Sequence, residues 1–175
     1  RSFRQDDVWN FERQQNLGSA YTMSRVVGKL YEDDKEKRAR ALQRHVDFMA
    51  ITPHLSTLLY GILAAMEEEN ANNSDFDESS ISAVRASLMG PIAGIGDSLL
   101  WGTLRIIAAG IAISFSQNGS ILGPLLFLLI INVPCMILRY VCLFKGYELG
   151  TSFFKKVLDS GIMDTVTYVA SSIGL

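Results

Sequence analysis

The chain has 175 residues, enough for one ordinary domain, and a formal net charge of −2 at pH 7. Hydrophobic residues make up 49% of it and charged residues only 19%, so it is more apolar than an average soluble domain. This composition argues against a nucleic-acid-binding protein and directs attention to the apolar segments.

The few charged residues are unevenly distributed. Residues 1–53 hold ten of the sixteen Lys and Arg residues. Residues 88–144, by contrast, carry only Asp97, Arg105 and Arg139. Because basic segments next to membrane spans favour the cytoplasmic side, we expect the N-terminal third to be cytoplasmic.

The first predicted element is a short helix over residues 6–18. Asp6 and Asp7 are good N-cap residues, and Gly18 is a helix-stop signal. No charged-then-apolar leader with a cleavage site precedes this segment, so we expect no secretory signal.

The second predicted element is an amphipathic, basic helix within residues 33–53, ended by Pro53. Such a helix can lie on an anionic membrane surface, and packing against a partner or the rest of the chain explains its pattern equally well. Its apolar positions recur at three- and four-residue steps, at Ala39, Leu42, Val46 and Met49.

Three apolar runs follow. Residues 121–144 contain one charge in 24 positions and are long enough for a bilayer core, which requires about 20 apolar residues. Residues 99–115 form a second, shorter run, and residues 54–66 are too short to span alone. A buried helix of a soluble protein is the alternative for the shorter runs, and residues 67–80 are predicted to be a polar loop.

These observations predict an all-α, helical integral membrane protein with broken or re-entrant helices and an amphipathic N-terminal region. Residues 1–53 would be cytoplasmic or interfacial helices, and residues 54–175 a membrane-embedded helical region. Cys135 and Cys142 lie inside the longest apolar run, where neither a disulfide framework nor metal-ligand spacing is readable. We therefore expect no metal site and assign both cysteines to packing.

The stretch "GIGDSLLWG" contains the letters GDSL, which resemble the motif of a serine esterase family with Ser98 as nucleophile. A nucleophilic serine needs a base, usually a histidine. His45 and His54 both precede Ser98, whereas that esterase family places its histidine late in the chain. A serine hydrolase therefore stays only a remote alternative.

The segment before Ser98, "LMGPIAGIGD", predicts a break in the helix. Its glycines permit close backbone approach, and Pro91 removes a helical hydrogen-bond donor. Irregular backbone at membrane depth is tolerated only where protein shields it or water reaches it, which is typical of a transporter's binding site.

After this segment, Asp97, Trp101 and Arg105 recur at every fourth residue and so share one helical face. A carboxylate that accepts hydroxyl hydrogen bonds beside a flat indole suits a sugar. Three structural alternatives stand beside this one. Asp97 can cap a helix that starts at Ser98, Trp101 can serve packing or interfacial anchoring, and Arg105, about 12 Å along the axis from Asp97, needs another partner.

Five ordered blocks then carry a family resemblance: "WNFERQQNLG", "LQRHVDF", "LMGPIAGIGDSLLWGTLR", "GSILGPLLF" and "KGYELG". Together they resemble the IID component of the mannose-fructose-sorbose family of the bacterial sugar phosphotransferase system. The resemblance implies an inner-membrane subunit that works with a IIC subunit to bind and translocate a hexose of the mannose class. Cytoplasmic IIA and IIB components would phosphorylate the sugar.

The resemblance implies no covalent chemistry, catalytic residue or cofactor in this subunit, since the phosphohistidines belong to other components. It departs at Cys135, where family members often carry Arg, and the C-terminal membrane portion expected of the family is missing after Leu175. A noncatalytic scaffold for the IIC subunit is the alternative function. The partners implied are a IIC subunit in a hetero-oligomer, a hexose and membrane lipid. The candidate sugar-binding residues are Asp97 and Trp101, with Asn10, Glu67 and His45 as weaker candidates.

Overall fold

The computed structural model describes residues 1–117 and 119–160, and in this part of the chain the elements are helices with no β-strand. This confirms the all-α prediction. The elements are η1 (Ser2–Arg4), α1 (Asn16–Leu30), α2 (Lys35–Arg44), α3 (Ser56–Asn72), α4 (Ser79–Gly96), η2 (Asp97–Leu104), α5 (Arg105–Ser116) and α6 (Leu122–Ser160).

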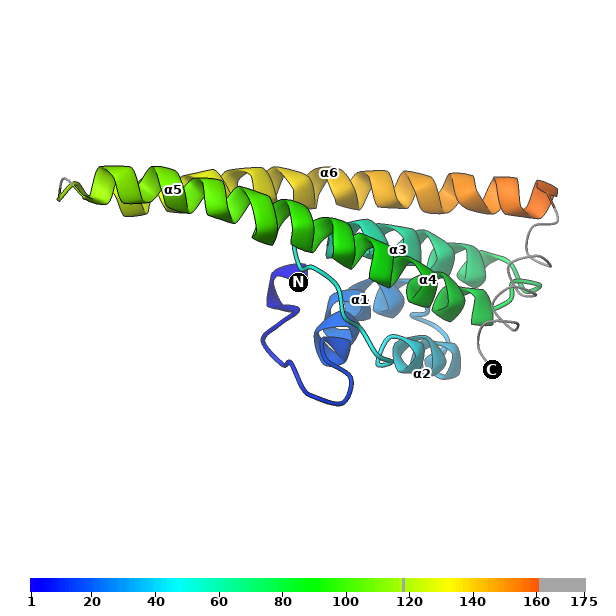
Figure 1. The fold of residues 1–175 in the computed structure, drawn as a ribbon. Helices are drawn as coiled ribbons and strands as arrows, with labels where there is room; N and C mark the ends of the chain where they lie inside the picture. Colours follow the sequence, from blue (N-terminus) through cyan, green and yellow to red (C-terminus); the bar gives the residue numbers. More distant parts are fainter. Residues whose placement is uncertain (118, 161–175) are drawn as a thin grey trace.

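A long helical hairpin dominates the molecule (Figure 1). Its first arm is the continuous run of α4, η2 and α5, and its second arm is α6. The apolar stretches of these arms, Ser79–Ser116 and Leu122–Gly150, are each long enough to cross a membrane. In their most apolar windows only 17% and 11% of residues are buried, so these helices are not core helices of a soluble domain. The prediction of a span over residues 121–144 is thereby supported.

The predicted break at residues 90–96 is wrong. Gly96 and Asp97 both keep right-handed helical backbone angles, and α4 runs through Pro91 without interruption. The irregularity is milder and comes later, as the π-helical stretch η2. Local π adjustments of this kind let apolar helices accommodate Pro and Gly without breaking.

Helix α3 is the buried element of the fold. Along most of its length it lies against α6, and it also packs on α1 and α4 (Figure 1). Leu59, Leu63 and Met66 are fully enclosed. The short run at residues 54–66 therefore contributes to a buried helix, which is the part of the alternative for the shorter runs that the structure supports. The polar loop is shorter than predicted, because α3 continues to Asn72 and α4 begins at Ser79.

Glycines allow α3 and α6 to touch through their backbones. A Cβ at Gly61 would overlap the Leu143 carbonyl oxygen, and one at Gly146 would overlap the Leu58 carbonyl oxygen. A Cβ at Gly150 would lie 2.7 Å from Ala65 Cβ. Small residues four apart are a common device for close helix packing in membranes.

The N-terminal region differs from its prediction in two places. Residues 6–18 are not a helix, because α1 starts only at Asn16 and includes Gly18, which packs directly on the backbone of Gln5. The basic helix α2 ends at Arg44, well before Pro53, so the chain from there to α3 is a loop. Its start agrees with a capping signal, since the Asp34 side chain accepts a hydrogen bond from Lys37 N.

Substituting Gly146 by Ala tests the α3–α6 contact. The added methyl collides with backbone that cannot move independently, so we expect a loss of about 1–3 kcal/mol of stability, as in overpacked cores. Gly110→Ala is the matched control, because nothing lies within 4 Å of a Cβ there. Thermal unfolding of the full-length subunit in detergent measures both. Equal melting temperatures for the two variants would contradict the contact.

Candidate functional site

The first candidate site lies where the loop between α2 and α3 crosses the start of η2. The Thr52 hydroxyl is 2.7 Å from Asp97 Oδ1 and 3.0 Å from the Ala93 carbonyl oxygen. Its one proton is therefore shared between two acceptors. Gly96 makes this approach possible, because a Cβ there would lie 2.5 Å from Thr52 Oγ1.

Asp97 is exposed and does not cap a helix, so the alternative that it caps a helix starting at Ser98 is wrong. The chain is already helical before Asp97, and η2 only widens the turn. Arg105 N–H donates to the carbonyl of Leu100, five residues back, as a π-helix requires. Asp97 is thus held by Thr52 with exposed carboxylate surface left over.

Trp101 contacts the side chains of His54 and Arg105. Its ring meets the His54 ring edge-on with centroids 6.1 Å apart, and the Arg105 guanidinium lies 5.0 Å from the indole centroid. The partner that Arg105 required is therefore Trp101 itself. Since Thr52 and His54 come from one loop, Asp97 and Trp101 face the same segment, which confirms their shared face.

Beside Trp101 is a small cavity of about 180 Å³. Residues of α6, among them Phe127 and Cys135, also line it. His54 Nδ1 is buried without a hydrogen-bond partner among the described residues. An aromatic wall beside a guanidinium can stack on and hydrogen-bond a small polar ring.

Ser98 shows none of the contacts of a nucleophile. It is exposed, and its hydroxyl donates to the Ile95 carbonyl oxygen at 3.1 Å. In the described part of the chain, His45 is hydrogen-bonded to Glu67 and His54 meets Trp101 edge-on, and neither histidine has a hydrogen bond to Ser98. The hydrolase alternative finds no support here.

The second cluster surrounds the fully buried carboxylate of Glu67. Its Oε1 lies 2.9 Å from His45 Nε2 and 2.9 Å from Arg44 Nε, and its Oε2 accepts from the Tyr31 hydroxyl at 2.9 Å. His45 is itself completely enclosed. A buried carboxylate is stable only with such partners, so this cluster ties α1, α2 and α3 together.

The cluster has a neutral and a charged side. Burial, and then the neighbouring Glu67 carboxylate, raise the pKa of Tyr31 well above its usual range, so its hydroxyl stays protonated and donates. Asn70 donates to the Tyr31 oxygen at 2.8 Å. On the charged side, Arg44 also pairs with Glu78 at 2.7 Å.

Asn10 stands apart from both clusters. Its Nδ2 donates to Asn16 Oδ1 at 2.7 Å, and its Oδ1 accepts from Arg13 N at 2.8 Å. Asn16 in turn donates to the Val46 carbonyl oxygen at 3.0 Å. Asn10 thus secures the segment before α1 to the end of α2.

The five predicted site residues therefore occupy three places. Asp97 and Trp101 lie together, His45 and Glu67 form the core of the buried cluster, and Asn10 is separate. Glu67 lies inside the protein and is 0% exposed, so in this structure it does not border solvent. Two residues of the first site, Thr52 and His54, have no sequence pattern that marks them as site residues. Short polar residues in a loop give no periodic signal.

Comparison with known families agrees with the fold and the site described above. The fold defines a helical membrane protein with a buried third helix and a polar site beside a π-helical stretch. The family model described as "PTS system mannose/fructose/sorbose family IID component" matches residues 1–175. The chain belongs to this family of IID components of the sugar phosphotransferase system (PTS).

Individual relatives agree with this assignment. The mannose-specific EIID component of Escherichia coli K12 is 36% identical over 95% of this chain and 59% of its own length. The fructose permease IID component of Bacillus subtilis 168 is 40% identical, covering 95% of this chain and 60% of its own. The sorbose-specific EIID component of Klebsiella pneumoniae is 37% identical over 100% of this chain and 63% of its own length. The chain thus spans about three fifths of their length.

Solved structures share the fold. A chain in the cryo-EM structure of the mannose transporter ManYZ with microcin E492 aligns with a TM-score of 0.89 and 35% identity, over 99% of this chain and 63% of that one. A second structure, described as a membrane protein, aligns with a TM-score of 0.80 over the same shares. Membership of a membrane-protein family agrees with the two exposed apolar arms.

Replacing Glu67 by Gln tests the buried cluster. The substitution removes the buried charge that faces Arg44 and leaves only the more exposed Glu78 as its ion-pair partner. We therefore expect about 3–5 kcal/mol of destabilisation, as when one member of a buried pair is removed. Glu69→Gln, on the same helix but not fully buried, is the matched control. Denaturation of the full-length subunit should separate the variants, and identical midpoints would show that the cluster carries little energy.

Proposed function

We propose that this chain is the main part of a IID subunit that, with a IIC subunit, binds and translocates a hexose of the mannose class. Cytoplasmic IIA and IIB components would supply the phosphoryl group. Family membership and the sugars named for the relatives support the class. The observation that carries the proposal at residue level is that one loop contacts both candidates: Thr52 donates to the exposed Asp97 carboxylate, and the His54 ring meets the Trp101 ring.

In this proposal Asp97 and Trp101 contact the sugar directly. The carboxylate accepts hydrogen bonds from ring hydroxyls, and the indole faces the apolar side of the ring. We assign the three weaker candidates an indirect role. His45 and Glu67 hold the end of α2, and Asn10 holds the chain before α1, so that the loop bearing Thr52 and His54 keeps its position.

The membrane placement belongs to the proposal as well. Residues 1–53 would form a cytoplasmic or interfacial region, and the chain from residue 54 onward the membrane-embedded part of an inner-membrane protein. The concentration of Lys and Arg in residues 1–53 supports a cytoplasmic N-terminus.

A scaffold role is the second candidate function, and one observation favours it. Nothing lies within 4 Å of a Cβ placed on Gly90, Gly94 or Gly110. The backbone at these glycines is therefore uncovered on the surface of an apolar arm. Small residues on an exposed membrane helix suit contact with another helix. A scaffold would stabilise a IIC subunit without touching sugar.

Asp97→Asn and Asp97→Ala separate these two functions. Asparagine keeps the oxygen that accepts from Thr52 but loses the charge, whereas alanine loses both. If Asp97 binds sugar through its charge, the Asn variant should assemble normally yet lose about 1.5–3 kcal/mol of sugar affinity. Sugar binding to the purified assembly of full-length subunits measures this. Unchanged affinity in a correctly assembled Asn variant would remove Asp97 from the sugar site.

Uptake and phosphorylation of labelled hexose in a strain lacking this subunit test the proposed class. Full-length wild-type chain should restore both activities, and the empty vector should not. Assembly is followed in parallel by co-purification with the IIC subunit. Restored assembly without restored uptake, for wild-type chain and every hexose of the class, would contradict transport of this class.

A further inference from the structure

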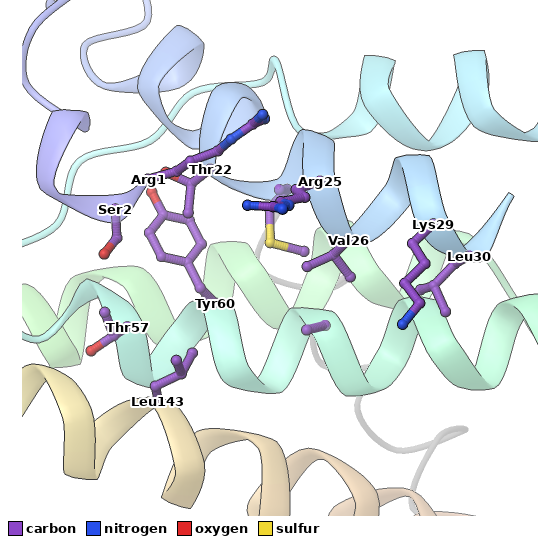
Figure 2. Close-up of a pocket in the computed structure, with 12 residues that line it drawn as sticks. Arg1, Ser2, Thr22, Arg25, Val26, Lys29, Leu30, Thr57, Tyr60 and Leu143 are labelled. Carbon is purple, nitrogen blue, oxygen red and sulfur yellow. The ribbon is translucent and has the colours of Figure 1, made fainter. Parts of the chain in front are cut away.

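A pocket of about 470 Å³ lies between α1, α3 and α6, away from the Trp101 cavity (Figure 2). Its floor is apolar, with Val26 and Leu30 on α1, Ala64 on α3 and Leu143 on α6. Neither Asp97 nor any residue bonded to it lines this pocket. The pocket is therefore separate from the proposed sugar site.

Cationic side chains border the pocket. Arg25 and Lys29 are exposed, lie one helical turn apart on α1, and both belong to its lining with Arg1 (Figure 2). Among the ion pairs of the described residues, none involves these three side chains. The border of the pocket therefore carries positive charge that no carboxylate of the described chain neutralises by a direct contact.

Two buried hydroxyls also line the pocket. Thr57 is 4% exposed and Tyr60 2%, and neither side-chain oxygen has a hydrogen-bond partner of normal geometry among the described residues. The Ser19 and Thr22 side chains lie beside the Tyr60 hydroxyl. The Thr57 and Tyr60 oxygens have almost no accessible surface, so these hydroxyls make the wall behind the apolar floor more polar without being open to a ligand.

The pocket is at the end of a membrane-spanning stretch. Leu143 lies within Leu122–Gly150, and the two members of the exposed Lys145–Glu148 pair follow it by two and five residues. At 1.5 Å per residue, Leu143 is about 10 Å from the end of this stretch. That depth is close to the level where acyl chains meet headgroups.

We propose that this pocket binds one anionic phospholipid. Its phosphate lies between Arg25 and Lys29, and the start of an acyl chain covers the apolar floor at Leu143. Basic pockets beside membrane helices favour anionic headgroups. An uncharged hexose gains nothing from the cations, and a free phosphate leaves the apolar floor uncovered.

The test uses full-length subunit in complex with IIC, reconstituted in nanodiscs that hold phosphatidylglycerol in phosphatidylcholine. Native mass spectrometry and exchange of labelled lipid report retained phosphatidylglycerol. The variant Arg25→Gln/Lys29→Gln should weaken retention about fivefold for each charge removed. The control Lys37→Gln/Arg40→Gln removes the same charges from exposed positions of α2 and should leave retention unchanged.

A second variant separates the pocket from general surface charge. Ala64→Phe fills the floor without altering any charge and should also release the lipid, with melting temperature and IIC co-purification as checks of folding. Three results would overturn the proposal: equal retention of phosphatidylcholine, full competition by inorganic phosphate, or unchanged phosphatidylglycerol retention in both pocket variants. Crosslinks from the pocket border to a protein segment that occupies it would overturn it as well.

Discussion

The backbone contact between α3 and α6 is the constraint on which the rest of the structure depends. Gly61 and Gly146 each face a main-chain carbonyl of the other helix, and side chains would separate them. Helices so close together exclude lipid and water from between them and gain dispersion contacts along their length. Helix α3, which is too short and too buried to act as an independent span, is thereby attached to a long apolar arm.

Helix α3 links its contact with α6 to the candidate site around Asp97 and Trp101. Glu67 lies in α3 and pairs with Arg44 and His45 at the end of α2, which fixes one end of the following loop. The other end of that loop joins α3 directly. The guanidinium of Arg139 in α6 also donates to the Pro53 carbonyl oxygen at 2.7 Å. Thr52 and His54 are consequently held against Asp97 and Trp101 from both sides.

Much of this fold was predictable from the sequence. The apolar run over residues 121–144 forms an exposed apolar helix, as predicted. A run of about 20 or more apolar residues has the length that a helix needs to cross a bilayer core. The four-residue spacing of Asp97, Trp101 and Arg105 correctly placed these residues on one face. Local patterns of this kind carry enough information when the helix itself decides the geometry.

Where distant contacts decide, the predictions failed. The sequence from Asp6 to Gly18 carries helix signals, yet the packing of Gly18 on the Gln5 backbone places Gly18 inside a later helix. Proline and glycine at residues 90–96 predicted a break, but the helix absorbs them and widens only in η2. The burial of Glu67 depends on partners 36 and 22 positions away, Tyr31 and His45, and no local pattern reveals such pairs.

Hydrogen–deuterium exchange of the full-length subunit in its complex tests the central claim most directly. If the α3–α6 contact organises the fold, amides of residues 59–66 should exchange as slowly as those of the central part of α6, and Gly146→Ala should accelerate α3 before α6. Rapid exchange throughout α3 while α6 stays protected would show that α3 is only loosely attached, and would contradict the account.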